Sequence, residues 1–186
     1  GDLFGSNPGY RFTIDKNASN TNMTGITLHN TQFWLTNTDH VTLDGISVIV
    51  EGQRVGSGVG VTAIRDNSSY ITVKNSNFYT RDNGGSSTLV LSWANYCVID
   101  NNTIRGVGNV GNLFYLNTYN IDVPGGVLVN SYNNVTNNRI YGPSASAAIC
   151  RAICDMGKGN LFENNFISYS GEGLASAANA EGNLEC

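Results

Sequence analysis

The sequence predicts an all-β solenoid of about five to six coils, a fold in which a short bent unit repeats along one axis. Three observations favour it: a nine-residue pattern occurs five times, two of its positions are apolar in every copy, and a position between them is always Gly or Asn. Measured at that position, successive copies lie 30, 26, 36 and 27 residues apart. Such a period indicates a solenoid rather than a compact globule. The copies begin at His40, Tyr70, Tyr96, Tyr132 and Gly159.

The fourth and ninth positions of the unit are predicted to face the core, because they are the two apolar columns. The fourth positions are Leu43, Val73, Ile99, Val135 and Phe162, and the ninth are Val48, Phe78, Ile104, Ile140 and Ile167. Segments between the copies also alternate in apolar residues, so each coil is expected to contain about three short strands. At a rise of about 4.8 Å per coil, the rod would be roughly 25 to 30 Å long.

The sixth position is predicted to form a sharp corner, because Gly and Asn tolerate a positive φ most readily. We expect the corner asparagines to stack into a ladder of amides, each bonding to the next. The ladder residues are Asn75, Asn101, Asn137 and Asn164. The first position reads His, Tyr, Tyr, Tyr and Gly, and we interpret this column as cross-strand packing in preference to ligand binding.

Composition bounds the domain organisation and the partners. We expect one domain over residues 1–186, with an edge or cap at 1–25, coils at 26–170 and an edge segment at 171–186. The net charge is -4 and the ten Lys and Arg residues are scattered, which disfavours nucleic acid. No apolar run approaches the roughly 18 residues of a membrane span, so none is expected. Because the chain begins at Gly1 without Met, we expect a processed or excised fragment.

Four cysteines allow three full pairings, which the sequence does not rank. Cys97 occupies a position held by Val41 and Ile71 in earlier copies and is interpreted as a buried thiol. The other three are candidates for disulfides or a link between subunits, because an even number of cysteines favours disulfides in an extracellular chain. They are Cys150, Cys154 and Cys186.

The longest departure from the period is the segment 105–130, which has about ten residues more than the other connections. Excursions from a solenoid often carry binding function. We therefore name Phe114, Tyr115 and Tyr119 as candidate contacts for a glycan or a protein partner, the alternative being a loop that packs its own aromatic residues. Among several Asn-x-Ser/Thr sequences, Asn67 and Asn134 are the better candidates for N-glycosylation.

The strand, asparagine corner, strand repeats over residues 26–167 resemble those of the right-handed parallel β-helix, the fold of pectate lyases, polygalacturonases, tailspikes and many adhesins. The resemblance implies the fold and leaves the activity open. Polygalacturonase-like enzymes carry an Asn-Thr-Asp sequence followed by paired aspartates, Gly-His-Gly and Arg-Ile-Lys. Asn37, Thr38 and Asp39 match the first of these, and the others do not follow.

The same resemblance would imply either paired acids for hydrolysis or clustered acids that bind calcium for a lyase. Hydrolysis needs two facing carboxylates, and calcium needs six to eight oxygen ligands. Asp44 and Asp100 share a column with Lys74 between them, which favours charge neutralisation over metal binding. We therefore expect no enzyme, no catalytic residue, no metal and no cofactor.

In style, the Asn-rich corners are similar to those of adhesin-like and sheath-type surface proteins of methanogenic archaea. That resemblance, with the exposed strand edges of a solenoid, predicts an extracellular structural subunit that self-assembles into a surface layer, sheath or fibre. A carbohydrate-binding adhesin domain that contacts a surface glycan is one alternative. A polysaccharide lyase or hydrolase is the other, and a β-sandwich is the alternative fold.

Overall fold

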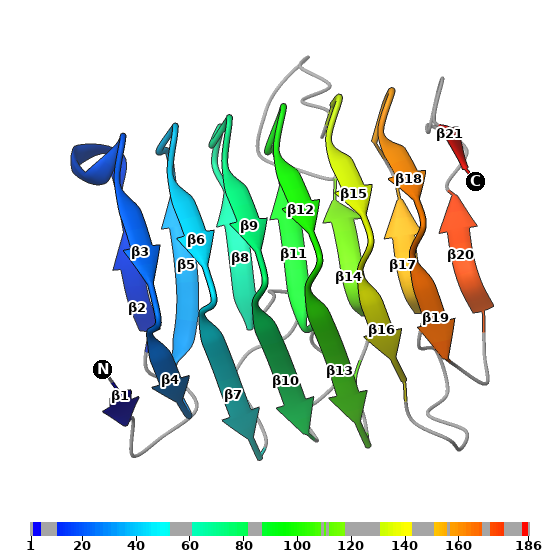
Figure 1. Cartoon of the computed structure of the whole chain (residues 1–186), viewed down its shortest axis with the longest axis horizontal. Coiled ribbons are helices and arrows are strands. Elements are labelled where there is room, and N and C mark those ends of the chain that lie inside the picture. Colours follow the sequence, from blue (N-terminus) through cyan, green and yellow to red (C-terminus); the bar gives the residue numbers. More distant parts are fainter. Residues whose placement is uncertain are drawn as a thin grey trace, which may run out of the picture.

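The chain folds into a rod of stacked strands (Figure 1), as seen in a computed structural model. The structure describes residues 2–4, 11–52, 61–81, 87–108, 110, 112–117, 131–142, 151–155, 157–168, 172–176 and 184–185. These residues form short strands and one 3-10 helix, η1 (Lys16–Ala18), which interrupts the first coil. Within the described residues, no helix is long and apolar enough to cross a membrane.

The strands form three parallel sheets of seven strands each, here called sheets A, B and C. Sheet A contains β1 (Asp2–Phe4), β4 (Thr27–His29), β7 (Ser47–Glu51), β10 (Asn77–Arg81), β13 (Thr103–Val107), β16 (Arg139–Tyr141) and β19 (Phe166–Ser168). Sheet B contains β2 (Arg11–Ile14), β5 (Gln32–Thr36), β8 (Thr62–Arg65), β11 (Leu89–Ser92), β14 (Asn112–Asn117), β17 (Arg151–Asp155) and β20 (Glu172–Ser176). Sheet C contains β3 (Asn22–Thr24), β6 (Thr42–Asp44), β9 (Thr72–Lys74), β12 (Val98–Asp100), β15 (Asn134–Thr136), β18 (Leu161–Glu163) and β21 (Leu184–Glu185).

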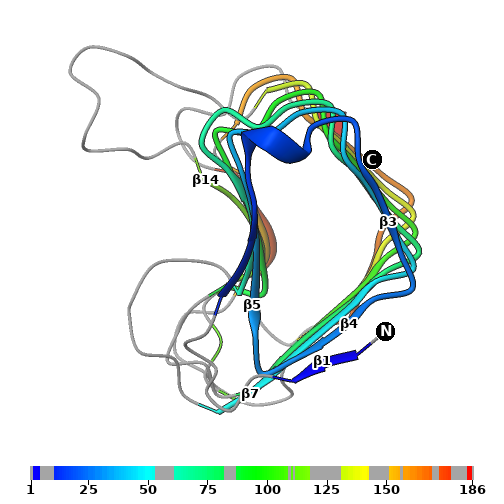
Figure 2. The ribbon, with the colours of Figure 1, turned by 90° about the vertical axis from the view of Figure 1, so that its left-hand side faces the viewer.

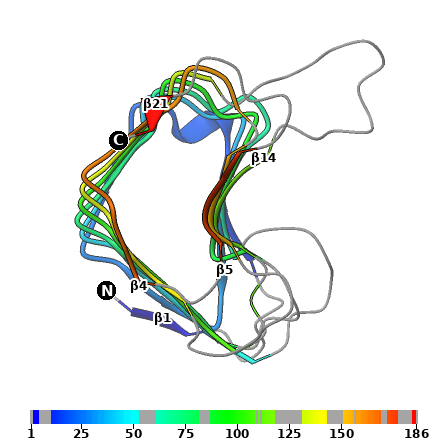
Figure 3. The same cartoon turned by 90° about the vertical axis from the view of Figure 1, so that its right-hand side faces the viewer.

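Each coil passes through sheet B, then sheet C, then sheet A, and β2 to β19 make six such coils. Seen along the rod, the coils superimpose as a three-sided outline (Figures 2 and 3). The predicted parallel β-helix is therefore confirmed, and so are three strands per coil. Strands β20 and β21 lie beyond the sixth coil, at the edges of sheets B and C.

The core lies between the three sheets and is built from the predicted columns. In sheet C, Leu43 is in register with Val73, and Val73 with Ile99, so equivalent apolar side chains meet in adjacent coils. Both predicted columns are buried, apart from Ile167, which is partly buried. Cys97 is a buried free thiol, as predicted, and burial raises its pKa to about 12.

Two corners in each coil have a left-handed backbone. The predicted sixth position is confirmed, since Gly45, Asn75, Asn101, Asn137 and Asn164 all have φ between +52° and +64°. The first position was not predicted to be left-handed. Its residues His40, Tyr70, Tyr96 and Tyr132 nevertheless have φ between +53° and +56°, an uncommon conformation for aromatic residues.

A buried amide ladder stands one residue beyond the predicted one. The Nδ2 of Asn102 donates to the Oδ1 of Asn138 over 3.1 Å, and that of Asn138 donates to the Oδ1 of Asn165 over 3.0 Å. Each of these amides also donates to a backbone carbonyl of the preceding coil, those of Val73, Ile99 and Val135. Because a buried polar group without a partner is costly, this inner ladder fixes the coil spacing from inside.

Candidate functional site

A groove runs along the outer face of sheet A. Its lining residues come from β7, β10, β13, β16 and β19 or directly follow them, so the groove crosses five levels of the rod. At about 4.8 Å per level, those four steps span roughly 19 Å. The groove has a volume of about 650 Å³. It is lined by Ile49, Glu51, Asn77, Tyr79, Thr103, Arg105, Tyr141, Gly142 and Ser168.

Strand alternation explains why these side chains face outward. In β10, Phe78 and Thr80 are buried, so Asn77, Tyr79 and Arg81 point to the other side of the sheet. The parallel register then aligns Tyr79 with Arg105, and Arg105 with Tyr141. The centre of the groove is therefore a column in which one guanidinium lies between two phenols on adjacent coils.

The groove face is locally basic although the chain is acidic. From β7 to β19, the outward charges of sheet A are Arg81, Arg105 and Arg139 against Glu51, a net of +2, whereas the whole chain carries -4. Of these four residues, Arg105 and Glu51 line the groove and the other two flank it. An Arg81 Nη1 lies 3.8 Å from a Glu51 carboxylate oxygen, and its Nε donates to the Tyr79 hydroxyl over 3.1 Å. No carboxylate of the described residues forms an ion pair with Arg105 or Arg139. These two exposed cations therefore remain available to a ligand.

This arrangement suits an extended anionic ligand. A guanidinium donates two parallel hydrogen bonds to a carboxylate or sulfate, and phenols combine an apolar ring with a hydroxyl that bonds sugars. Among the described residues, Glu51 is the one carboxylate that lines the groove. Paired acids of the kind that hydrolyse glycosides are thus absent from the described part of this face.

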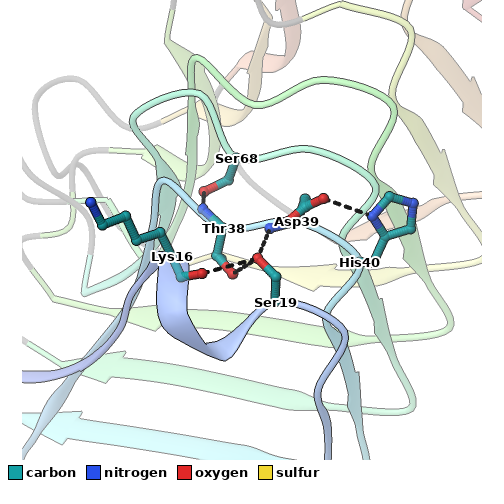
Figure 4. A network of polar contacts seen from close by, with 6 residues as sticks. All are labelled: Lys16, Ser19, Thr38, Asp39, His40 and Ser68. Atoms are coloured by element: carbon teal, nitrogen blue, oxygen red, sulfur yellow. Dashed lines mark hydrogen bonds and ion pairs between the residues drawn. The ribbon is translucent and has the colours of Figure 1, made fainter.

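The matched tripeptide lies at another place, in the corner between sheets B and C (Figure 4). Thr38 is buried, and the Asp39 carboxylate accepts a hydrogen bond from Nδ1 of His40 at 2.9 Å. Hydrogen bonds with Ser19 and with His40 hold the pKa of Asp39 below its ordinary value. Ser19 is engaged with the Lys16 carbonyl, Thr38 and the Asp39 amide, so it does not form a nucleophile pair with His40.

The aromatic column is a continuous stack. Ring centroids lie 4.9 Å apart for His40 and Tyr70, 5.2 Å for Tyr70 and Tyr96, and 5.5 Å for Tyr96 and Tyr132. The rings are nearly parallel, with interplanar angles of 19° or less. Their faces are thus covered by one another and only edges and hydroxyls reach solvent, which agrees with the interpretation as cross-strand packing.

The corner asparagines are exposed and bond in a mixed pattern. Asn101 donates to Asn75 over 2.8 Å, as the predicted ladder requires. Asn75 donates instead to Asp44, and Asn137 to Asp100, each over 2.7 Å. The prediction that each amide bonds to the next is therefore wrong at Asn137, because a carboxylate on the preceding strand is a stronger acceptor. Asn164 occupies the same exposed corner in the last copy.

Of the three predicted contact residues, Phe114 is corrected. It is fully buried, because alternation in β14 turns Phe114 and Leu116 into the core. Tyr115 points to the opposite face, where it packs against Trp34, Ala63 and Val90. Tyr119 lies outside the described residues. The excursion 105–130 thus begins with a regular core strand rather than a loop.

The remaining predicted residues lie on the surface or outside the described part. Asn67 and Asn134 are both exposed. Cys150 and Cys186 fall outside the described residues, and of Cys154 only the backbone, in β17, is described. Their proposed disulfide or intersubunit roles stay predictions.

The groove residues were not predicted from the sequence. A signal was nonetheless present, because the residue after each ninth position gives the column Ile49, Tyr79, Arg105, Tyr141 and Ser168. This column is chemically mixed, so its regular spacing is apparent only when the register is known.

Comparisons with known proteins support the fold. No protein-family model and no curated protein sequence matches the chain. Among solved structures, the chain is similar to the A-module of the mannuronan C-5 epimerase AlgE6 of Azotobacter vinelandii, with a TM-score of 0.54 and 13% identity. The match covers 96% of this chain and 55% of that one, so the chain spans about half the length of the module.

This likeness corrects the expectation that the chain is not an enzyme. The epimerase modifies a polysaccharide and has the same parallel β-helix, so the fold gives no ground for a non-enzymatic assignment. The comparisons give no support to the resemblance to archaeal sheath-type proteins. What they establish is a parallel β-helix that is similar to a carbohydrate-modifying enzyme among solved structures.

Proposed function

We propose that this protein binds an acidic polysaccharide along the groove of sheet A. The observation that carries the proposal is the pair of exposed arginines, Arg105 and Arg139, that no described carboxylate neutralises. A linear ligand suits a groove that crosses five levels of the rod. We also propose an extracellular location, because polysaccharides of this kind are found outside cells.

The charge distribution supports an acidic ligand over a neutral one. A chain with a net charge of -4 repels polyanions in general, so a local charge of +2 must be concentrated on the binding face to attract one. The ion pair of Arg81 and Glu51 is exposed and long, and such pairs contribute at most about 1 kcal/mol. Arg81 can therefore exchange Glu51 for a ligand acid at little cost. The neighbouring fold belongs to an enzyme named for mannuronan, a polyuronate, which agrees in ligand class.

Calorimetric titration tests the proposal. Oligosaccharides of mannuronan serve as the acidic probe, and neutral oligosaccharides of equal length serve as the control. We expect binding of the acidic series alone, weakened by salt as the Debye length falls from about 10 Å at 0.1 M to about 3 Å at 1 M. Equal binding of both series, or binding of neither, would contradict the proposal.

A second candidate is proton transfer at the sugar carbon next to the ligand carboxylate. Arg105 would neutralise the carboxylate, and Tyr79 and Tyr141 lie one coil away on either side of it. One of the two tyrosines, as phenolate, would remove the proton, and the other would donate one. Donation to the opposite face of the same carbon gives epimerisation, whereas donation to the departing glycosidic oxygen breaks its bond to the neighbouring carbon and forms a carbon–carbon double bond. Product analysis by NMR and ultraviolet absorbance after incubation with mannuronan tests this candidate. An unchanged polymer under conditions of demonstrated binding would contradict it.

Self-association is a further candidate, favoured by the ends of the rod. The apolar residues that pack on the core but are only partly buried gather in the first coil and the last. They are Phe12, Ala18, Met23, Ile26 and Ile167. Stacking of one rod on another would bury them and pair the sheet edges. Sedimentation should show polymers that Met23→Glu disrupts, whereas a monomer at every concentration would contradict this candidate.

A further inference from the structure

We propose that Phe166 and Tyr141 form an aromatic subsite for one sugar ring of the polysaccharide, beyond the unit whose acid binds Arg105. This inference rests on the proposed function and specifies how the far end of the groove contributes to it. The subsite would recognise the apolar face of a pyranose ring rather than its charge.

The position of Phe166 supports a role in the groove. Phe166 begins β19, at the end of sheet A, and is in register with Arg139. Its side chain points outward and is 56% exposed. The ring centroid lies 5.9 Å from that of Tyr141, a groove residue, at an interplanar angle of 56°. Phe166 therefore extends the groove with an aromatic wall.

A comparison with the stacked tyrosines shows why Phe166 can accept a ring. Tyr70, Tyr96 and Tyr132 are exposed to a similar degree, from 48% to 51%. Their faces are nevertheless occupied by parallel neighbours. Phe166 is instead tilted against Tyr141 and 56% exposed, so no parallel ring among the described residues covers its face, and a sugar ring can pack there.

The spacing makes the subsite dependent on ligand length. Arg105 lies in β13 and Phe166 in β19, two coils further along sheet A. At about 4.8 Å per coil, the two side chains begin roughly 10 Å apart along the rod. One sugar unit held by its acid at Arg105 would not reach Phe166, whereas a longer chain would cover both.

Titration with a length series tests the subsite. Acidic saccharides from the monosaccharide to the octasaccharide are titrated into the wild type, Phe166→Ala and Phe166→Tyr, with Tyr70→Ala as a control of similar exposure. For the longer ligands, Phe166→Ala should weaken binding roughly three- to tenfold, and Phe166→Tyr should restore it. For the monosaccharide, all four proteins should bind alike. Thermal melting checks that each variant folds.

The outcomes separate this inference from the function on which it depends. Weaker binding of long ligands alone supports the subsite. Equal affinity of Phe166→Ala and the wild type for every length overturns the subsite and leaves the proposed function standing. An equal loss at every length also overturns it, because Phe166 would then act on the Arg105 unit. If the wild type binds no acidic oligosaccharide, the proposed function and the subsite fail together.

Discussion

The outer faces of sheets A and C come from the same coils and differ in how they use their charges. On sheet C, Lys74 lies 3.3 Å from Asp44, and the carboxylates of Asp44 and Asp100 accept hydrogen bonds from Asn75 and Asn137. On sheet A, Arg105 and Arg139 have no described carboxylate partner. The outward charges of β6 to β18 in sheet C, Asp44, Asp100 and Glu163 against Lys74, give a net of -2, against +2 for β7 to β19 of sheet A.

The same repeat therefore gives its two outer faces different chemistry. Polar groups of sheet C bond to the next coil, so that face stabilises the stack. On sheet A, Arg81 and Asn77 contact Glu51 and Ser47 of the preceding coil. In its central column, by contrast, no hydrogen bond or ion pair between described residues joins Tyr79, Arg105 and Tyr141 across coils. We infer that stability is determined mainly inside the rod and at the sheet C corner, which leaves sheet A available for a ligand.

The largest effect should come from breaking the buried ladder that both faces share. Asn138→Ala removes hydrogen bonds with Asn102, Asn165 and the Ile99 carbonyl. Leaving these groups buried without partners should lower the free energy of unfolding by about 3 to 5 kcal/mol. Chemical denaturation measures this loss. The control is Asn137→Gly, the exposed neighbour, for which we expect less than about 1 kcal/mol. Similar losses at both positions would contradict the importance of the inner ladder.

The next largest effect should be on ligand affinity, and it should differ between substitutions on sheet A and on sheet C. Arg105→Gln removes a charge from sheet A and should weaken binding of an acidic oligosaccharide by about 10- to 100-fold, since a hydrogen bond to a charged group contributes about 1.5 to 3 kcal/mol. Lys74→Gln removes the same charge from sheet C and should leave the affinity unchanged. Calorimetry measures both. Equal losses would mean that the ligand senses net charge rather than a site.

A smaller effect is expected where the aromatic column adjoins sheet C. Tyr96→Asn removes two stacking contacts, each contributing about 0.5 to 1.5 kcal/mol. It also relieves a left-handed Tyr, whose strain is about 1 to 2 kcal/mol. These terms nearly cancel, so the free energy of unfolding should change by less than about 1 kcal/mol, and ligand affinity should not change. A loss of ligand affinity would show that the column, and not sheet A alone, contacts the polysaccharide.

The smallest effect should be a pH dependence of stability that comes from Asp44. Hydrogen bonding by Asn75, with Lys74 nearby, holds the pKa of Asp44 below its ordinary value. Its carboxylate therefore stabilises the fold at pH values above its ordinary pKa, and this contribution is lost as the pH falls through the depressed value. Thermal melting should show the wild type slightly more stable than Asp44→Asn at neutral pH, with the difference vanishing in acid. A difference that grows in acid would have the wrong sign.

Much of the fold was predictable because the pattern of apolar and corner residues repeats in every coil. Leu43, Val73 and Ile99 occupy equal positions in successive repeats, and alternation alone places them inside. The inner ladder was missed because its column is mixed: Ile46 and Ser76 precede Asn102, Asn138 and Asn165. In pairs such as Asn101 and Asn102, only the corner geometry decides which amide points inward.

The groove was less predictable because it depends on register between coils. The sequence separates Tyr79 from Arg105 by 26 residues and Arg105 from Tyr141 by 36. Nothing local brings them together, and neither residue type is unusual on a surface. Phe114 was misassigned for a related reason. Its segment was interpreted as a loop, whereas it forms strand β14, in which Phe114 faces the core and Tyr115 faces outward.

Binding of an acidic polysaccharide by sheet A can be tested by an NMR titration of the isotopically labelled protein with an acidic oligosaccharide. We expect shift changes for residues of sheet A, in β10, β13, β16 and β19, including the side-chain Nε–H of Arg105. Residues of β6, β9 and β12 in sheet C should keep their shifts. Changes centred on sheet C or on the stacked tyrosines, or no saturable change anywhere, would contradict it.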